Sequence, residues 1–380
     1  MFGFPGALPG LPIDKQNLGL FDQRLALDWV QRNIAVFGGN KDKVTIFGES
    51  AGAASVDFLS LTLSPSEAPF RAAIMQSGTY FLNDNAIGVI GPQVPAPPEP
   101  VRTLSNSVGC GYDSNTLSCL RNKTTAQIKA GLDQNPVNPW QPTADGITVP
   151  SQNKGWRIRT LLGGARVPTL IGTNADEGTI FELFGTPGTF SYLFTTQFPE
   201  LAQYEAQIRA AYPIGGCGPQ QCFDTELDAV SQAVGDYLWT CTAAREARAS
   251  ALSIVPTWRY YFNKTSVNSP PPLLPYVFHG LEIPSVFGTI PEDSPADEKA
   301  VSKYMQKAWA DFAKSPLLGP GWKLYTGLPL LKEVNMIGGP QNPTGRFDID
   351  NNIVDAACHI YAPLYAQRDG LLRKARRHFA

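Results

Sequence analysis

The spacing of apolar positions predicts a helix near the start of the chain. Leu27, Val30 and Ile34 recur at helical spacing, which makes one face of a helix over 22–36 apolar. Asp22 can cap the start of this helix, and a pair of glycines ends it. The polar residues between these positions would then face water or a neighbouring element.

Two short runs with the character of buried strands follow this helix. The first, Val-Thr-Ile-Phe at 44–47, is rich in β-branched and aromatic residues, and the second lies at 71–75. A helix through about Leu59 separates them, and a further apolar run at 167–172 predicts a third strand. Strands that alternate with helices indicate βαβ units and a parallel sheet, so the predicted fold class is α/β.

The remainder of the chain has a less regular pattern. Helical spacing covers 227–249, 301–314 and 362–379, and aromatic and basic residues alternate at 258–262 as in a strand. The expected loops lie at 92–100, at 270–275 and, with a short helix, at 150–162. No shift in composition marks a linker, so residues 1–380 are predicted to form a single domain.

Composition and charge exclude several classes of protein. Apolar residues make up 43% of the chain and charged residues 17%, which excludes a disordered chain and supplies a large core. The net charge of −2 gives no reason to expect a nucleic-acid partner. No stretch of about 20 mostly apolar residues predicts a membrane span. The first residues also lack the basic and apolar regions of a secretory signal.

The cysteines nevertheless favour an oxidising compartment. Their number is even, and two pairs lie close together within loop-like sequence, although six cysteines allow many connectivities. The expected pairs are Cys110–Cys119, Cys217–Cys222 and Cys241–Cys358. The spacing offers no metal-ligand motif, so we expect no metal. Asn122 and Asn263 each begin an Asn-Lys-Thr sequon, which is compatible with a secreted glycoprotein.

The strongest chemical motif is the segment Gly48-Glu-Ser-Ala-Gly52. In α/β-hydrolases a G-x-S-x-G segment forms a sharp turn between a strand and a helix and exposes the serine hydroxyl. A strand precedes this segment and an alanine-rich helix follows it, as the motif requires. We therefore predict that Ser50 is a nucleophile and that the Ala51 N–H stabilises an oxyanion. The crowding of such a turn predicts that Gly48 and Gly52 must both be small.

Longer segments resemble the type-B carboxylesterases, the family of carboxylesterases, cholinesterases and fungal lipases. The resemblance lies in FDQRLALDWVQRNIAVFGGNKDKVTIFGESAG at 21–52, APFRAAIMQSGTYF at 68–81, GTNADEGTIF at 172–181 and FHGLEIPSVFG at 278–288. It implies an α/β-hydrolase fold with a mostly parallel central sheet. Asn40 departs from the Asp that relatives commonly carry there, and this loop change does not touch the chemistry.

A serine nucleophile needs a base, and the chain offers only His279, His359 and His378. The α/β-hydrolase order of serine, acid and histidine leaves all three possible. The resemblance of the segment around His279 to the family's catalytic-histidine segment selects that residue.

The acid must orient the histidine from a loop that follows a strand. Asp176 and Glu177 come directly after the predicted strand at 167–172, although other carboxylates also satisfy the order. The family uses the Glu of a similar Asp-Glu-Gly segment, which selects Glu177 and leaves Asp176 as a structural, hydrogen-bonding neighbour.

The resemblance extends to residues behind the triad. Glu49 would be the carboxylate beside the nucleophile, where purely structural bonds are the simpler interpretation. Ser77 resembles a serine that lies near the acid and the histidine, and a hydroxyl that caps the next turn explains it equally well. The resemblance also supports the pair Cys110–Cys119, which similar fungal members have.

The resemblance implies hydrolysis of a small-molecule or lipid carboxylic ester through an acyl-enzyme, with no cofactor. Relatives carry an HGGG-like loop well before the serine, and no such motif precedes Phe21. We therefore expect an N-terminally truncated chain that lacks the first strands and the oxyanion loop, is secreted in its full-length form and is inactive or poor as an esterase. The alternatives are a non-catalytic, cholinesterase-like interaction module and a truncated pseudoenzyme.

Overall fold

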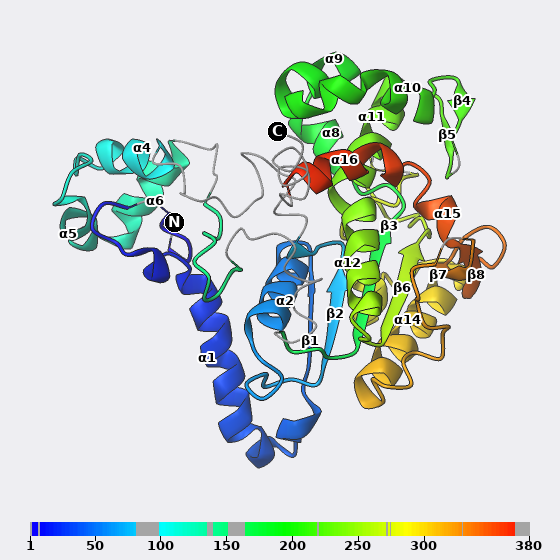
Figure 1. Cartoon of the computed structure of the whole chain (residues 1–380), viewed down its shortest axis with the longest axis horizontal. Coiled ribbons are helices and arrows are strands. Elements are labelled where there is room, and N and C mark those ends of the chain that lie inside the picture. Colours follow the sequence, from blue (N-terminus) through cyan, green and yellow to red (C-terminus); the bar gives the residue numbers. More distant parts are fainter. Residues whose placement is uncertain are drawn as a thin grey trace, which may run out of the picture.

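Six strands form one central sheet in the computed structural model (Figure 1). The structure describes residues 2–6, 8–80, 99–134, 140–150, 164–218, 220–270, 273, 275–328 and 330–368. The strand order is β1-β2-β3-β6-β7-β8. The strands are β1 (Thr45–Glu49), β2 (Ala72–Gln76), β3 (Thr169–Asn174), β6 (Thr257–Phe262), β7 (Lys332–Ile337) and β8 (Arg346–Asp350).

The sheet is mostly parallel, as the sequence predicted. Parallel ladders join β1 to β2, β2 to β3, β3 to β6 and β6 to β7. Only β8 is antiparallel, and it pairs with β7. Because parallel strands end at the same edge of a sheet, the residues that follow β1 and β3 are brought to one edge. Both segments carry residues that the sequence marked as catalytic.

Helices flank the sheet and form two groups beside it (Figure 1). α2 packs on β1 and β2, while α12 packs on β3 and β6. Beside the sheet, α4, α5 and α6 lie together, and the helices from α8 to α11 form a second group (Figure 1). The α-helices are α1 (Leu18–Asn33), α2 (Ala51–Thr62), α4 (Glu99–Ser107), α5 (Thr116–Arg121), α6 (Thr125–Asp133), α8 (Thr179–Gly185), α9 (Phe190–Tyr192), α10 (Glu205–Ala211), α11 (Glu226–Gly235), α12 (Cys241–Leu252), α13 (Ile283–Phe287), α14 (Ala296–Lys314), α15 (Asn351–Val354) and α16 (Cys358–Arg368).

Two predicted helices differ from the observed ones in detail. The first helix begins at Leu18, after Asn17 rather than at Asp22. The first turn, Leu18-Gly-Leu-Phe, lies before the apolar positions at Leu27, Val30 and Ile34 that indicated the helix, and the cap assigned to Asp22 placed the start one turn too late. The helix predicted over 227–249 is α11 and α12 joined by a π-helical turn at Asp236–Thr240. Such a turn inserts an extra residue without changing the apolar spacing enough to be read from sequence.

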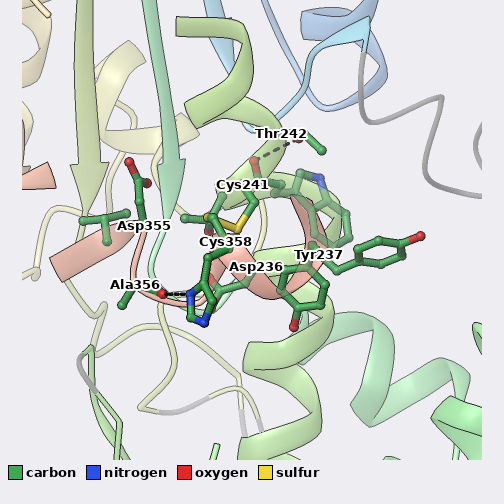
Figure 2. The surroundings of a disulfide bond; sticks show 12 residues. Asp236, Tyr237, Cys241, Thr242, Asp355, Ala356 and Cys358 are labelled. Carbon is green, nitrogen blue, oxygen red and sulfur yellow. Dashed lines mark hydrogen bonds between the residues drawn. A yellow bond between two sulfur atoms is a disulfide. The ribbon is translucent and has the colours of Figure 1, made fainter. Parts of the chain in front are cut away.

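The three expected disulfides are present. The Cα atoms lie 5.6 Å apart in Cys110–Cys119, 3.7 Å apart in Cys217–Cys222 and 5.3 Å apart in Cys241–Cys358. The last bond joins the start of α12 to the start of α16, as Figure 2 shows. The predicted loop at 92–100, the short helix within 150–162 and the end of the helix over 362–379 lie wholly or largely outside the described residues.

Within the ranges that the structure describes, no helix has both the length and the apolar character needed to cross a bilayer.

Candidate active site

Ser50 occupies a strained turn between β1 and α2. Its backbone angles are φ 55° and ψ −119°, a region that residues with a side chain rarely adopt. The turn is held from behind, because the Ser50 N–H donates to the Gln76 carbonyl at 2.9 Å. A strained strand-to-helix turn of this kind is the conformation that presents a nucleophilic serine in α/β-hydrolases.

The two glycines of the motif have different roles in this structure. A Cβ atom at Gly48 would lie 2.4 Å from the carbonyl carbon of Gly52, so no side chain fits there. A Cβ atom at Gly52 would meet nothing within 4 Å. The expectation that both positions must be small is therefore wrong for Gly52, because its α-carbon faces open space at the first turn of α2.

The first turn of α2 supplies the candidate oxyanion donor. Ala51 is the first residue of α2, so helix geometry leaves its N–H without an intrahelical acceptor. The partial positive charge at a helix N-terminus favours an anion in front of this N–H. The Ala51 N–H can thus donate to an oxyanion formed next to Ser50.

Glu177 lies in the turn that follows β3 and is 1% exposed. Its Oε1 accepts the backbone N–H of Asn174 at 2.7 Å. Its Oε2 lies 2.5 Å from His279 Nδ1. One carboxylate oxygen is therefore fixed by the end of β3, and the other holds the imidazole.

His279 reaches this carboxylate from a loop that is tied to the same strand end. The Val277 N–H donates to the Asp176 carboxylate at 2.7 Å, and the Asp176 N–H donates to the Val277 carbonyl at 3.0 Å. Asp176 is thus the structural neighbour that the sequence predicted. The other ring nitrogen, Nε2, lies 3.1 Å from Glu49 Oε1 and, within the described chain, forms no hydrogen bond with Ser50 or any other group.

The charges of this cluster shift the pKa values of its members. Burial by itself would lower the pKa of His279, but the Glu177 carboxylate outweighs it and raises that pKa to about 8. Burial raises the pKa of Glu49 to about 7, although His279 opposes this shift. The imidazolium is therefore stabilised mainly by Glu177, and Glu49 adds to this only as it ionises around pH 7.

A buried polar network behind the histidine was missed by sequence reasoning. Glu282 is completely buried and accepts hydrogen bonds from Gln76 Nε2 at 3.0 Å and from Asn174 Nδ2 at 2.7 Å. Trp309 Nε1 in turn donates to Gln76 Oε1 at 2.9 Å. The signal was a carboxylate three residues after His279, on an otherwise apolar segment. Burial raises the pKa of Glu282.

An aromatic wall packs on the histidine ring. The centroids of Trp239 and Phe181 lie 5.0 Å and 5.4 Å from that of His279, and these two aromatic rings stack on each other at 5.0 Å. Trp239 belongs to the π-helical turn at Asp236–Thr240, so this irregular turn places an indole against the imidazole. The wall restricts the orientations that His279 can adopt.

The remaining predicted residues lie in other settings. Ser77 is fully buried with φ 52°, and its hydroxyl caps no turn, because it has no hydrogen-bond partner among the described residues. A role of Ser77 near the acid and the histidine stays a prediction. His359 is exposed and bonds the Ala356 carbonyl, away from the cluster, and His378 lies outside the described residues. Asn122 is exposed, whereas Asn263 is half-buried.

The same side chains can also be compared with the ligand sets that hold metal ions. In the ranges that the structure describes, no three His, Cys, Asp or Glu side chains are arranged to hold a metal ion. The cluster of Glu177, His279 and Glu49 is instead arranged for proton transfer, because each imidazole nitrogen faces a carboxylate.

Most of this chain is similar in sequence to known proteins. Residues 2–322 match the model of the carboxylesterase family. A cholinesterase of Mus musculus is 34% identical over 339 residues, which cover 81% of this chain and 53% of that protein. The acetylcholinesterase of Bungarus fasciatus is 32% identical over 351 residues, 83% of this chain and 54% of that protein. The chain thus spans about half the length of the curated relatives it matches.

Sequence and architecture agree on one assignment. The central sheet is mostly parallel, and a strained serine turn follows β1. The acid lies in the turn after β3 and the histidine in the loop after β6, where the two are paired. The family match extends over most of the residues that build these features. The chain therefore belongs to the carboxylesterase family and has its α/β-hydrolase fold.

Proposed function

We propose that this chain is a serine carboxylic ester hydrolase. In the proposed reaction, Ser50 Oγ attacks the ester carbonyl and passes its proton to His279 Nε2, and His279 then protonates the leaving alcohol. An acyl group remains on Ser50 Oγ until water attacks it, with His279 again taking the proton. Glu177 keeps the imidazole oriented and stabilises its positive charge throughout.

The observation that carries the proposal is the 2.5 Å contact between His279 Nδ1 and Glu177 Oε2 beside the strained Ser50 turn. This contact directs Nε2 away from Glu177 and toward the segment that contains the serine. In the structure Nε2 lies 3.1 Å from Glu49 Oε1 and has no hydrogen-bond partner within the described chain, so the Ser50 hydroxyl must engage it when substrate binds. Catalytic hydrogen bonds often shorten only in the substrate complex.

The substrate class follows from the surroundings of the histidine. Trp239 and Phe181 present apolar ring surface beside the base, which favours an ester with an apolar acyl or alcohol part. The two relatives are named as cholinesterases, and this supports ester hydrolysis in general. The Ala51 N–H is the proposed oxyanion donor.

An organophosphonate probe tests the nucleophile. It should attach to Ser50, as peptide mass spectrometry would show, and Ser50→Ala should lose both the label and hydrolysis of p-nitrophenyl acetate. The matched control is Ser55→Ala, which removes a serine hydroxyl from α2, the helix that follows Ser50. In the structure this hydroxyl donates to the Ala51 carbonyl at 2.9 Å. Labelling that persists in Ser50→Ala, or hydrolysis that does, would refute the assignment and favour the non-catalytic alternative.

We also propose that the protein is secreted and glycosylated. The three disulfides fit an oxidising compartment. Asn122 is the better acceptor, because its side chain is exposed at the end of α5 whereas Asn263 is half-buried. In a secretory host, an Asn122→Gln variant should lose one glycan in gel mobility.

A further inference from the structure

A small hairpin closed by a disulfide packs beside α11 (Figure 1). Its strands are β4 (Gly216–Cys217) and β5 (Cys222–Phe223), which run antiparallel with Cys217 directly opposite Cys222. The two cysteines are exposed and bonded to each other, so the disulfide closes the hairpin at the surface. The turn between the strands contains two half-buried glutamines whose side chains reach into the protein.

Gln221, the last residue of this turn, connects the hairpin to the segment that carries His279. Its Nε2 donates a hydrogen bond to Asp176 Oδ1 at 3.1 Å. The other oxygen of the same carboxylate, Oδ2, accepts the Val277 N–H at 2.7 Å. Because Asp176 is buried, these two hydrogen bonds take the place of bonds to water and fix the carboxylate between the hairpin and the histidine loop.

The amide of Gln221 is held in this orientation by a second acceptor. Nε2 also donates to Gln232 Oε1 at 2.6 Å, so both hydrogens of the amide group are used. Gln232 Nε2 in turn donates to Asp236 Oδ1 at 3.0 Å, which ties the amide to α11 and to the π-helical turn that follows it. Rotation of the Gln221 amide would therefore break both of its hydrogen bonds at once.

Asp176 lies where a displacement would reach the proposed acid and base together. It directly precedes Glu177, whose Oε2 lies 2.5 Å from His279 Nδ1. It also forms an isolated β-bridge with Phe278, the residue directly before the histidine. A change in the position of the Asp176 carboxylate is therefore expected to alter the contact between Glu177 and His279.

Other hydrogen bonds hold the histidine loop as well. The Tyr276 hydroxyl donates to Asp228 Oδ1 at 2.6 Å, and Asn174 Nδ2 donates to the Phe278 carbonyl at 2.9 Å. Loss of the bond from Gln221 should therefore loosen the loop without releasing it.

We propose that Gln221 is a positioning residue for ester hydrolysis, which acts through Asp176 to hold His279 against Glu177. In this proposal the Cys217–Cys222 disulfide keeps Gln221 in place. The inference rests on the proposed function of the Ser50 site. Without the amide, Asp176 Oδ1 loses a hydrogen bond inside the protein, and the carboxylate turns toward another donor.

Gln221→Leu tests this role, because leucine is similar in size and donates no hydrogen bond. For p-nitrophenyl acetate, kcat should fall about tenfold while KM changes by less than about twofold, since a misplaced base slows the reaction more than it weakens substrate binding. The matched control is Gln220→Leu, a change of the same residue type in the same turn. Gln220 Nε2 donates to Asp236 Oδ1 at 3.2 Å and to the Val354 carbonyl at 2.8 Å instead, so this variant should keep kcat.

The proton between His279 Nδ1 and Glu177 Oε2 gives a measurement that needs no activity. In the proton NMR spectrum of the unmodified chain it should resonate downfield of the backbone amides, and His279→Ala should remove this resonance. Gln221→Leu should shift or broaden the resonance, because the contact between acid and base changes. Gln220→Leu should leave it in place.

The disulfide gives a second test that leaves Gln221 in the chain. The double variant Cys217→Ser and Cys222→Ser should lower kcat in the same direction as Gln221→Leu and should shift the same resonance. The matched control is the double variant Cys110→Ser and Cys119→Ser, which opens another short disulfide loop, next to α5. It should leave both kcat and the resonance unchanged.

The proposal is wrong if Gln221→Leu keeps both the kcat and the His279 resonance of the unmodified chain, or if Gln220→Leu changes them equally. It is also wrong if the loss lies in KM alone, or if the unmodified chain lacks the resonance. If the unmodified chain does not hydrolyse the ester, the proposed function fails, and the resonance alone still decides whether Gln221 positions the imidazole. Near-UV circular dichroism verifies folding, and if Gln221→Leu is not folded the two disulfide variants decide.

Discussion

At the scale of single residues, the pKa of His279 governs the expected pH profile of hydrolysis. The neutral imidazole is the base, and Glu177 raises its pKa to about 8, so the rate should fall as the pH drops below 8. Glu177→Gln removes the anion and leaves burial to lower the pKa. Its profile should move to lower pH, and its plateau should fall by about 10³–10⁴-fold. The kcat/KM for p-nitrophenyl acetate between pH 5 and 9.5 measures both changes.

Glu49→Gln is the companion variant for this profile. Glu49 also raises the pKa of His279, though less than Glu177 does, so this variant should shift the profile in the same direction by a smaller amount. A profile that stays in place in both variants would show that these carboxylates do not control the base.

The burial of Asp236 leads to a separate prediction, which concerns how the free energy of unfolding depends on pH. Burial raises its pKa from 3.8 to about 7, against hydrogen bonds from Tyr212, Gln220 and Gln232 that lower it. The folded state therefore holds this proton more tightly than the unfolded state. The associated stability is complete below about pH 3.8 and is lost as the pH rises toward 7, by on the order of a few kcal/mol.

Asp236→Asn is expected to flatten this dependence. The free energy of unfolding, measured by urea titration at pH 5 and pH 8, should differ less between the two values than in the unmodified chain. Asp311→Asn, at a half-buried position on α14, should keep the original difference. A difference that persists in Asp236→Asn would mean that the other described carboxyl and imidazole groups with raised pKa values account for the whole effect; these are Glu49, Asp176, Glu182, His279 and Glu282.

At the scale of elements, the two glycines of the serine turn form a matched pair. Gly48→Ala should abolish hydrolysis and destabilise the fold by more than about 2 kcal/mol, because a Cβ there meets the backbone of Gly52 at 2.4 Å. Gly52→Ala meets nothing within 4 Å and should raise the free energy of unfolding by up to about 1 kcal/mol through helix propensity. Denaturation of both variants compares them, and equal destabilisation would contradict the geometry.

Some strands of the sheet could be predicted from the sequence and others could not. The strands β1, β2, β3 and β6 were predictable, because each contains a short run rich in apolar, β-branched or aromatic residues. The residues of β2, β3 and β6 are buried throughout, as in strands covered on both faces, whereas β1 is only partly buried. β7 and β8 were not predicted. In the sequences KEVNMI and RFDID, polar residues interrupt the apolar runs. The buried Asn335 donates to the Arg259 carbonyl, a partner 76 residues away that no local pattern shows.

The residues of the candidate site also differ in how far the sequence predicts them. Ser50 is marked by a local motif, and Glu177 and His279 were chosen through a family resemblance. Their pairing then follows from the parallel order of the strands. Glu282 carries only a weak mark, a carboxylate in an otherwise apolar segment, because its role arises from a buried network. Trp239 carries none, because its place arises from a π-helical turn that no local pattern specifies.

At the scale of the whole molecule, the edge of the sheet at β1 is the expected place of self-association. β1 is the outer strand of the order, and Phe47 on it is 49% exposed and contacts Phe287, which is 59% exposed. An exposed apolar edge strand is a template for pairing with another chain. We expect concentration-dependent association in sedimentation velocity, which Phe47→Lys should reduce.

The matched control is Phe184→Lys, which replaces a phenylalanine 67% exposed on α8, away from this edge. It should associate as the unmodified chain does. If the two variants behave alike, general surface hydrophobicity rather than the β1 edge causes the association.

The buried pair of Arg259 and Asp355 has a consequence for biosynthesis. The partners are 96 residues apart, so at a synthesis rate of about 5–20 residues per second a ribosome adds Asp355 some 5–20 s after Arg259. During that interval the guanidinium on β6 cannot be enclosed without a lone charge in the interior, which costs about 3–5 kcal/mol. Closure of the sheet around β6 should therefore wait until Asp355 has left the ribosome, and stalled nascent chains ending before residue 355 should remain sensitive to protease within β6.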